Sequence, residues 1–153
     1  MLPRGLITVL FVSSIVAPTL AFANLAPPRP AAGKWKIDDG GGFTVNRSRN
    51  SISSFSVKPG GTAGCGTAEI RIAGEQKLST VSRGGVTNWV VGRSSESGSA
   101  LISGVGTVKV KVHQGGHDKT GGLSLLFGVA GNPLDNDGAL TFGGCTKYFD
   151  FEK

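Results

Sequence analysis

The sequence predicts an all-β domain: an antiparallel β-sandwich of the immunoglobulin-like (Ig-like) kind, or a small barrel, stapled by one disulfide. Three observations predict it. Apolar and polar residues alternate along short runs, most clearly in Thr107–His113, as in a strand with one buried face. Glycine makes up 25 of 153 residues, against about 7% in an average protein, and gathers between these runs. After residue 23, no window of eleven residues has apolar positions at helical spacing.

The run Thr107–His113 shows the alternation in detail. Val108, Val110 and Val112 would share the buried face of a strand, and Lys109 and Lys111 the polar face. Further strands are expected at Lys34–Ile37, Phe43–Val45, Phe55–Val57, Glu69–Ile72, Trp89–Val91, Ala100–Ser103, Leu123–Phe127, Leu140–Phe142 and Tyr148–Phe151. Turns are expected at the glycine clusters, among them Gly40–Gly42 and Gly121–Gly122. Gly143–Gly144 fits either a hairpin turn or a bulge in one long strand.

The N-terminus has the pattern of a secretory signal peptide. Arg4 is followed by an apolar stretch of 11 residues, Leu6–Val16, then by Pro18 and by the small-x-small motif Ala21–Ala23. A membrane-spanning helix would need about 20 apolar residues. We therefore expect residues 1–23 to be a cleaved signal peptide, 24–33 a Pro/Ala-rich linker and 34–153 a single all-β domain.

The chain has two cysteines, Cys65 and Cys145. An exported protein meets an oxidising compartment, and two thiolates without nearby histidines cannot complete a zinc site. We expect the two cysteines to form a disulfide. It would close a loop of about 80 residues, which stabilises a fold by about 4 kcal/mol in the chain-entropy description.

The net charge of the chain is +6, and it becomes +5 once the signal peptide with Arg4 is removed. A basic balance favours polyanionic surfaces, although it also serves solubility. The sequence names no partner: a cell-surface or wall polymer is the candidate class, and a basic surface that serves solubility alone is the outcome we expect most. Nucleic acid is not expected as a partner. After the expected signal peptide, no segment is apolar enough to span a membrane.

No catalytic, cofactor or metal constellation stands out, so we expect a non-enzymatic domain without cofactors. His113 and His117 have a metal-ligand spacing, but Gln114–Gly116 between them favours a turn over a helix. Asp135–Gly138 lacks the later ligands of a calcium loop. A secreted hydrolase built from scattered residues stays an alternative, with His113 or His117 as its base.

Five residues are candidate ligand contacts. Trp35, Trp89 and Tyr148 could form a sugar-stacking platform, although Trp35 shares a strand face with Ile37 and Trp89 with Val91, which favours a place in the core for both tryptophans. Lys109 and Lys111 could contribute to a basic patch or simply face solvent. Asn46 begins a glycosylation sequon, which matters only in a cell that has the machinery.

Several short motifs together resemble small secreted β-sandwich proteins of Gram-positive bacteria. The motifs are Gly33–Trp35, Gly42–Val45, Ile52–Val57, Cys65–Gly66, Gly138–Phe142 and Cys145. The resemblance implies export and an Ig-like sandwich, and it supplies no catalytic residue.

The expected function is that of a secreted, soluble binding or surface-interaction domain whose ligand the sequence does not name. A carbohydrate- or cell-wall-binding module that uses exposed aromatics is the second expectation.

Overall fold

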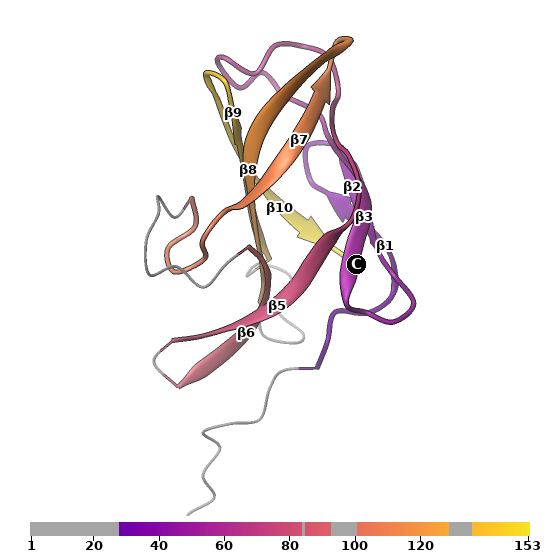
Figure 1. Ribbon diagram of the computed structural model, residues 1–153, viewed down its shortest axis with the longest axis vertical. Helices are drawn as coiled ribbons and strands as arrows, with labels where there is room; N and C mark the ends of the chain where they lie inside the picture. Colours follow the sequence, from indigo (N-terminus) through magenta and orange to yellow (C-terminus); the bar gives the residue numbers. More distant parts are fainter. Residues whose placement is uncertain (1–27, 84, 93–100, 129–135) are drawn as a thin grey trace, which may run out of the picture.

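The computed structural model describes residues 28–83, 85–92, 101–128 and 136–153, which form ten antiparallel strands and no helix (Figure 1). The strands are β1 Gly33–Ile37, β2 Gly41–Val45, β3 Ser51–Val57, β4 Ile70–Ile72, β5 Gln76–Arg83, β6 Val86–Val91, β7 Val108–Gln114, β8 His117–Phe127, β9 Asp137–Phe142 and β10 Cys145–Glu152. The signal peptide expected at residues 1–23 lies outside the described residues.

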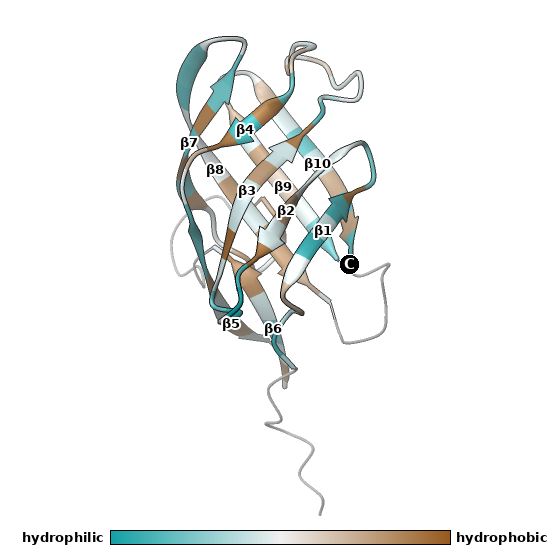
Figure 2. Cartoon of the chain, turned by 90° about the vertical axis from the view of Figure 1, so that its right-hand side faces the viewer, coloured by the Kyte–Doolittle hydropathy of each residue, from teal (hydrophilic) through white to brown (hydrophobic). Residues whose placement is uncertain are grey.

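The sheet closes on itself as a barrel of eight strands. Most strands pair with a neighbour along the chain, but β4 pairs with β7 instead of β5, β6 pairs with β8 instead of β7, and β10 pairs with β1 through Ile37 and Phe151. Ten strands fill eight places because two places are shared. At one end of the barrel, β4 and β7 lie between β3 and β8, whereas β5 and β6 take those places at the other end. Figure 2 shows the wall that runs from β1 through β2, β3 and β4 to β7.

An aromatic cluster fills the interior. Phe151 contacts Trp35, Phe43 and Phe127 with ring centroids 5.0–6.0 Å apart, mostly edge to face. Such pairs add about 0.5–1.5 kcal/mol each beyond the burial of their area. The interior of an eight-stranded barrel is just wide enough for side chains to fill. The inward residues of the strands therefore form the core of the domain.

A bulge in β3 brings two apolar residues to the same side. The pairing between β2 and β3 shifts between Gly42 and Thr44, and Ser54 has a positive φ of 53°. The extra residue changes the alternation, so that Ile52 and Phe55 are both buried although three positions separate them. This bulge explains why the alternation of the strand breaks in the sequence.

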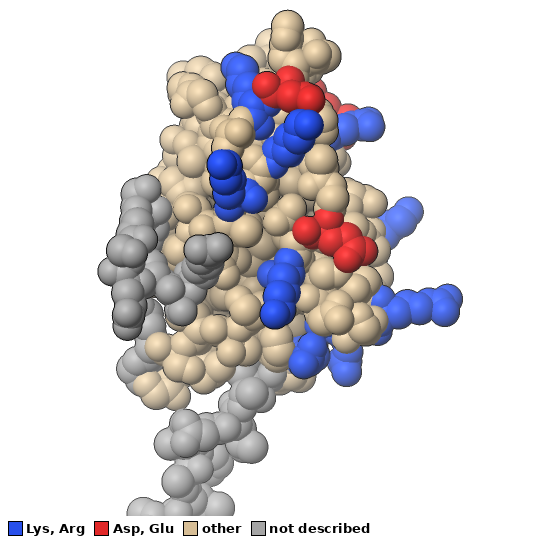
Figure 3. Space-filling model, in the orientation of Figure 1, with Lys and Arg blue, Asp and Glu red and all other residues tan. Residues whose placement is uncertain are grey.

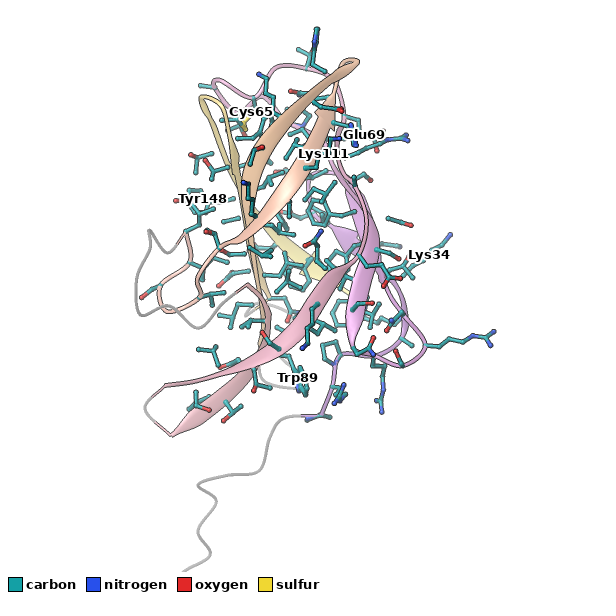
Figure 4. The ribbon with its side chains drawn as sticks, in the orientation of Figure 1. Lys34, Cys65, Glu69, Trp89, Lys111 and Tyr148 are labelled. Atoms are coloured by element: carbon teal, nitrogen blue, oxygen red, sulfur yellow. A yellow bond between two sulfur atoms is a disulfide. The ribbon has the colours of Figure 1, made fainter. Side chains whose placement is uncertain are left out.

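One end of the barrel, which we call the disulfide mouth, is covered by residues 58–69. Cys65 in this loop is bonded to Cys145 at the start of β10, as expected from the sequence (Figure 4). Gln114 donates to the carbonyl oxygens of Cys65 and Ala68 at 2.6 and 2.9 Å. The loop is thus held on both sides, by the disulfide and by a β7 side chain.

The disulfide mouth also contains a buried lysine. Lys147 is 4% exposed, and its Nζ donates to Asp39 in the β1–β2 turn and to Thr62 Oγ1 at 3.3 Å. A buried charge needs such partners, because an unpaired one is costly. The pair therefore connects the covering loop to the neighbouring turn.

The opposite end, which we call the tryptophan mouth, lies where β1 begins. There the indole N–H of Trp35 donates to the carbonyl oxygen of Ala31 at 2.9 Å, and Pro30 is buried. Pro28–Ala32, within the stretch expected as a linker, therefore lies against this end of the barrel.

The structure confirms the all-β, antiparallel, disulfide-bonded fold, and it closes as a barrel rather than as an Ig-like sandwich. Gly143–Gly144 is a hairpin turn. Of the strand expected over Ala100–Ser103, Ala100 lies outside the described residues, and Ile102 forms one isolated bridge with Val105. Gly121 and Gly122 were expected in a turn but lie within β8. A Cβ at Gly121 would lie 2.4 Å from the carbonyl oxygen of Thr141, so this glycine permits close approach of β9.

Loss of the disulfide should destabilise the domain strongly. We expect Cys65→Ala to lower the free energy of unfolding by about 2–5 kcal/mol, because the unfolded chain then regains the conformational freedom of the segment of 80 residues that the bond closes. Urea denaturation followed by tryptophan fluorescence measures it. The double variant Cys65→Ala/Cys145→Ala should lose a similar amount, and an unchanged midpoint in both variants would contradict a structural role for the bond.

Gly138 should be intolerant of any side chain. A Cβ there would lie 2.0 Å from the ring of Phe149, so Gly138→Ala must displace a core aromatic. We expect a loss of about 1–3 kcal/mol, as for other overpacked cores. Gly144→Ala is the matched control, since a Cβ at that position meets nothing within 4 Å. Equal stability of the two variants in urea denaturation would show that the Phe149 ring moves freely.

Candidate functional site

The outer face of β7 and β8 carries a hollow lined with lysines. Because residues alternate along a strand, Val110 and Val112 are buried in the barrel while Lys109 and Lys111 point outward. The hollow has a volume of about 370 Å³. It is lined by Lys109, Val110, Lys111, Asp118, Lys119 and Thr120. We call this surface the lysine wall, and Figure 3 shows Lys and Arg side chains standing out over the β7–β8 hairpin.

Asp118 is the acidic group in the lysine wall. Its carboxylate accepts from His113 Nδ1 on the opposing strand and lies 3.5 Å from Lys111 Nζ. The hydrogen bond from His113 holds the pKa of Asp118 below its usual value, and the charge of Lys111 acts in the same direction. Within the described part of the chain, Lys109 and Lys119 form no ion pair. Their ammonium groups remain available to an anion from outside.

β4, the strand that pairs with β7 beside the lysine wall, carries an ion pair of its own. Arg71 on β4 lies 3.3 Å from Glu69, and hydrogen bonds from Ser56 and Arg71 hold the pKa of Glu69 below its usual value. Both side chains are exposed, so the pair stabilises the fold little. The positive charge of Arg71 is therefore largely offset by Glu69. The uncompensated positive charge of this surface lies at Lys109 and Lys119 of the lysine wall.

His113 and Asp118 are the one histidine–carboxylate pair that the described residues bring together. A histidine bonded to a carboxylate through Nδ1 could serve as a general base. Among the described residues, however, no hydroxyl or thiol is hydrogen-bonded to the other ring nitrogen. His117 lies across the β7–β8 turn, where it pairs with Gln114. The described residues thus place no hydroxyl or thiol nucleophile beside this histidine.

The three candidate aromatics do not form one platform. Trp35 is 9% exposed, with its ring stacked on Phe43 at 6.1 Å between centroids. Trp89 on β6 is half-buried, and the guanidinium carbon of Arg29 lies 4.7 Å from its ring centroid. Tyr148 on β10 is 62% exposed, far from Trp89 in Figure 4. Tyr148 is thus the one of the three that presents its ring to solvent.

A second, smaller hollow lies beside Tyr148. Its volume is about 230 Å³. It is lined by Leu101, Ile102, Asp137, Gly138, Tyr148, Phe149 and Asp150. An exposed aromatic ring with carboxylates nearby is suited to stacking on a sugar and accepting its hydroxyl hydrogen bonds.

The sequence reading missed several of these residues. Asp118 and Lys119 were not singled out, although the short Gly115–Gly116 turn sets β8 against β7 and pairs Asp118 with His113. Predicting a β-hairpin at Gly115–Gly116 could have found these residues, because the position of a turn fixes which residues of its two strands lie opposite each other. Asn46 serves the β2–β3 turn, where its amide nitrogen donates to Asn50 and Ser51.

The comparisons with known proteins found no matching family, no matching curated protein and no matching solved structure. In the part of the chain that the structure describes, no helix could cross a bilayer. No three His, Cys, Asp or Glu side chains gather as metal ligands within those residues either. What the domain binds must therefore be inferred from its own surface.

The pKa of Asp118 should depend mainly on His113. We expect His113→Ala to return it toward the ordinary value, and Lys111→Ala to change it less, because the histidine hydrogen bond is the larger cause. The lowered pKa means that the pair stabilises the fold at neutral pH and loses its effect as the pH falls through that pKa. An NMR titration of the carboxyl carbon in the three proteins measures this, and a larger shift in Lys111→Ala would contradict it.

Proposed function

We propose that this chain is a secreted, non-enzymatic binding domain whose lysine wall attaches it to anionic polymers of a cell surface or wall. The observation that carries the proposal is the hollow on β7 and β8, in which the ammonium groups of Lys109 and Lys119 have no acidic partner among the described residues. Phosphate or carboxylate groups of a polymer would supply that partner.

The position of the lysines suits a polymer better than a small anion. Lys109 and Lys111 are two residues apart on one strand, which places their backbones about 7 Å from each other. They are exposed, and the hollow is open to solvent rather than enclosed. Exposed charges are each worth little, so useful affinity requires a ligand that meets several of them together.

Export is supported by two features. The N-terminal sequence has the order of charge, apolar core and cleavage motif of a signal peptide. The Cys65–Cys145 disulfide suits an oxidising compartment. The resemblance to secreted proteins of Gram-positive bacteria agrees with this proposal, and a wall polymer rich in phosphate or carboxylate would be a suitable ligand.

A second candidate function is carbohydrate binding at Tyr148. It is favoured by the 62% exposure of this tyrosine beside a hollow that also contains Asp137 and Asp150. Stacking on a neutral sugar depends little on salt, whereas binding at the lysine wall should depend on it strongly. Salt dependence therefore separates the two candidates.

The proposal predicts that charge reversal on the lysine wall weakens binding to long-chain polyphosphate. We expect Lys109→Glu/Lys119→Glu to lower the affinity at least about tenfold and to reduce the slope of log affinity against log salt by about 1.5–2, because two phosphate contacts are lost. Isothermal titration at several salt concentrations measures both quantities. The fold should be retained, since neither side chain is buried.

The matched control is Lys34→Glu/Lys36→Glu. These exposed lysines lie on β1, on the opposite side of the barrel, and the substitution changes the net charge by the same amount. It should lower the affinity less than about threefold, as an effect of net charge alone. Equal losses in the two double variants would refute a specific site. The carbohydrate candidate would be supported instead if the protein bound dextran with an affinity independent of salt concentration and Tyr148→Ala abolished this binding.

A further inference from the structure

The segment Pro28–Ala32 lies on the tryptophan mouth as a bound peptide would. Arg29 stacks its guanidinium on the ring of Trp89 at 4.7 Å, and its Nη1 donates to the carbonyl oxygen of Arg49 at 3.3 Å. Pro30 is buried, and the carbonyl oxygen of Ala31 accepts from the indole N–H of Trp35 at 2.9 Å. Three consecutive residues thus each make a distinct contact.

These contacts do not depend on sheet pairing. The first residue of β1 that pairs is Gly33, opposite Val45, and no backbone–backbone hydrogen bond in the described structure ties residues 28–32 to the barrel. The contacts are made by side chains and by two carbonyl oxygens. A separate peptide of the same sequence could make all of them.

The chemistry of the mouth matches a proline-rich, extended ligand. An indole N–H that donates to a peptide carbonyl, an aromatic face and an apolar place for a proline ring are features that recognise polyproline-type segments. Arginine on a tryptophan face adds a cation–π attraction of about 0.5–1 kcal/mol at an exposed site. Such a segment also loses little entropy on binding, because proline is already restrained.

We propose that the tryptophan mouth is a binding site for extended proline-rich peptide segments that contain an arginine, and that residues 28–32 occupy it in cis. An external segment of this chemistry would compete with the chain's own. This proposal is independent of the lysine wall, which lies on the outer face of β7 and β8.

The covalent link explains why the cis segment would hold the site. A short tether gives an effective concentration of about 1 mM or more, so a cis segment is bound most of the time when its intrinsic dissociation constant is about 0.1 mM or tighter. Gly33, the first residue of β1, directly follows residues 28–32. It has a φ of 109°, a conformation that other residues rarely adopt. An external peptide therefore binds well only after the cis segment is removed.

The test compares the mature chain, Asn24–Lys153, with a variant that begins at Gly33, using the peptide PPRPAA, which has the sequence of residues 27–32. Tryptophan fluorescence follows the titration. We expect the peptide to bind the shortened chain with a dissociation constant of about 0.1 mM or tighter, and the mature chain at least about tenfold more weakly. The peptide PPAPAA, without the arginine, and a shortened chain with Trp89→Leu should both bind more weakly.

Two results would overturn the proposal. One is a folded shortened chain that does not respond to the peptide at about ten times the expected dissociation constant. The other is equal binding to the mature and the shortened chain, which would place the peptide elsewhere.

A second measurement keeps the test decisive if the shortened chain does not fold. In the mature protein, the indole N–H of Trp35 is protected by its bond to Ala31. We expect Arg29→Ala to speed the hydrogen exchange of this indole N–H several-fold, since the segment then detaches more often. Arg47→Ala, an exposed arginine in the β2–β3 turn, should leave the rate unchanged. Equal exchange in both variants would show that Arg29 does not hold the segment in place.

Discussion

The fold depends on the contact between Phe151 and the aromatic residues around it. β10 closes the barrel by pairing with β1, and Phe151 lies opposite Ile37 in that pairing. The same side chain packs against Trp35 from β1, Phe43 from β2 and Phe127 from β8. Closure of the sheet and filling of its interior are therefore one event. A sheet that did not close would leave the Phe151 ring exposed. An interior without this ring would bury less apolar area, so it would favour closure less.

Because the inward residues are apolar, polar chemistry is displaced to the ends and the outer wall. The buried exception is Lys147, which lies at the disulfide mouth and reaches Asp39 and Thr62. At that mouth a covalent bond holds the covering loop, since Cys65 and Cys145 link it to the start of β10. At the tryptophan mouth, residues 28–32 are held in the described structure by two hydrogen bonds and by side-chain contacts, without a covalent cross-link. This difference is why we place the proposed exchange of occupants at the tryptophan mouth.

Alternation in the sequence was enough to predict most strands, because a half-buried strand leaves a period of two. It placed Lys109 and Lys111 on an outer face, where the structure also has them. It missed β5, Gln76–Arg83, of which only Gln76 and Lys77 pair with β3, while Val81–Arg83 extend with Val86–Asn88 of β6 as a two-stranded ribbon beyond the pairing of β6 with β8. Such a ribbon has little core to face, so its sequence shows no apolar stripe.

Glycine and closure were harder to predict. Glycines were taken as turns, but Gly41 and Gly121 lie in strands where a Cβ would meet a backbone oxygen of the neighbouring strand at 2.2 and 2.4 Å. The two uses of glycine look the same in a sequence. The choice between sandwich and barrel rests on whether the last strand meets the first. That pairing joins Lys36 to Glu152 and Ile37 to Phe151, residues more than a hundred positions apart, so no local pattern reveals it.

The two proposed sites differ in how they would gain affinity. On the lysine wall the backbone of β7 is fixed by Val110 and Val112 in the core, but the lysine side chains are long and exposed. Each contact there must offset the loss of side-chain freedom, so affinity grows only with the number of charges on the ligand. At the tryptophan mouth the receptor side is rigid, because Trp35 is packed between Phe43 and Phe127. A proline-rich ligand is rigid as well, and so a few contacts can suffice. Under the two proposals, the barrel would present a multivalent surface to long anionic chains and a small, preorganised site to a short peptide, and one fold could support both because the two sites share no residue.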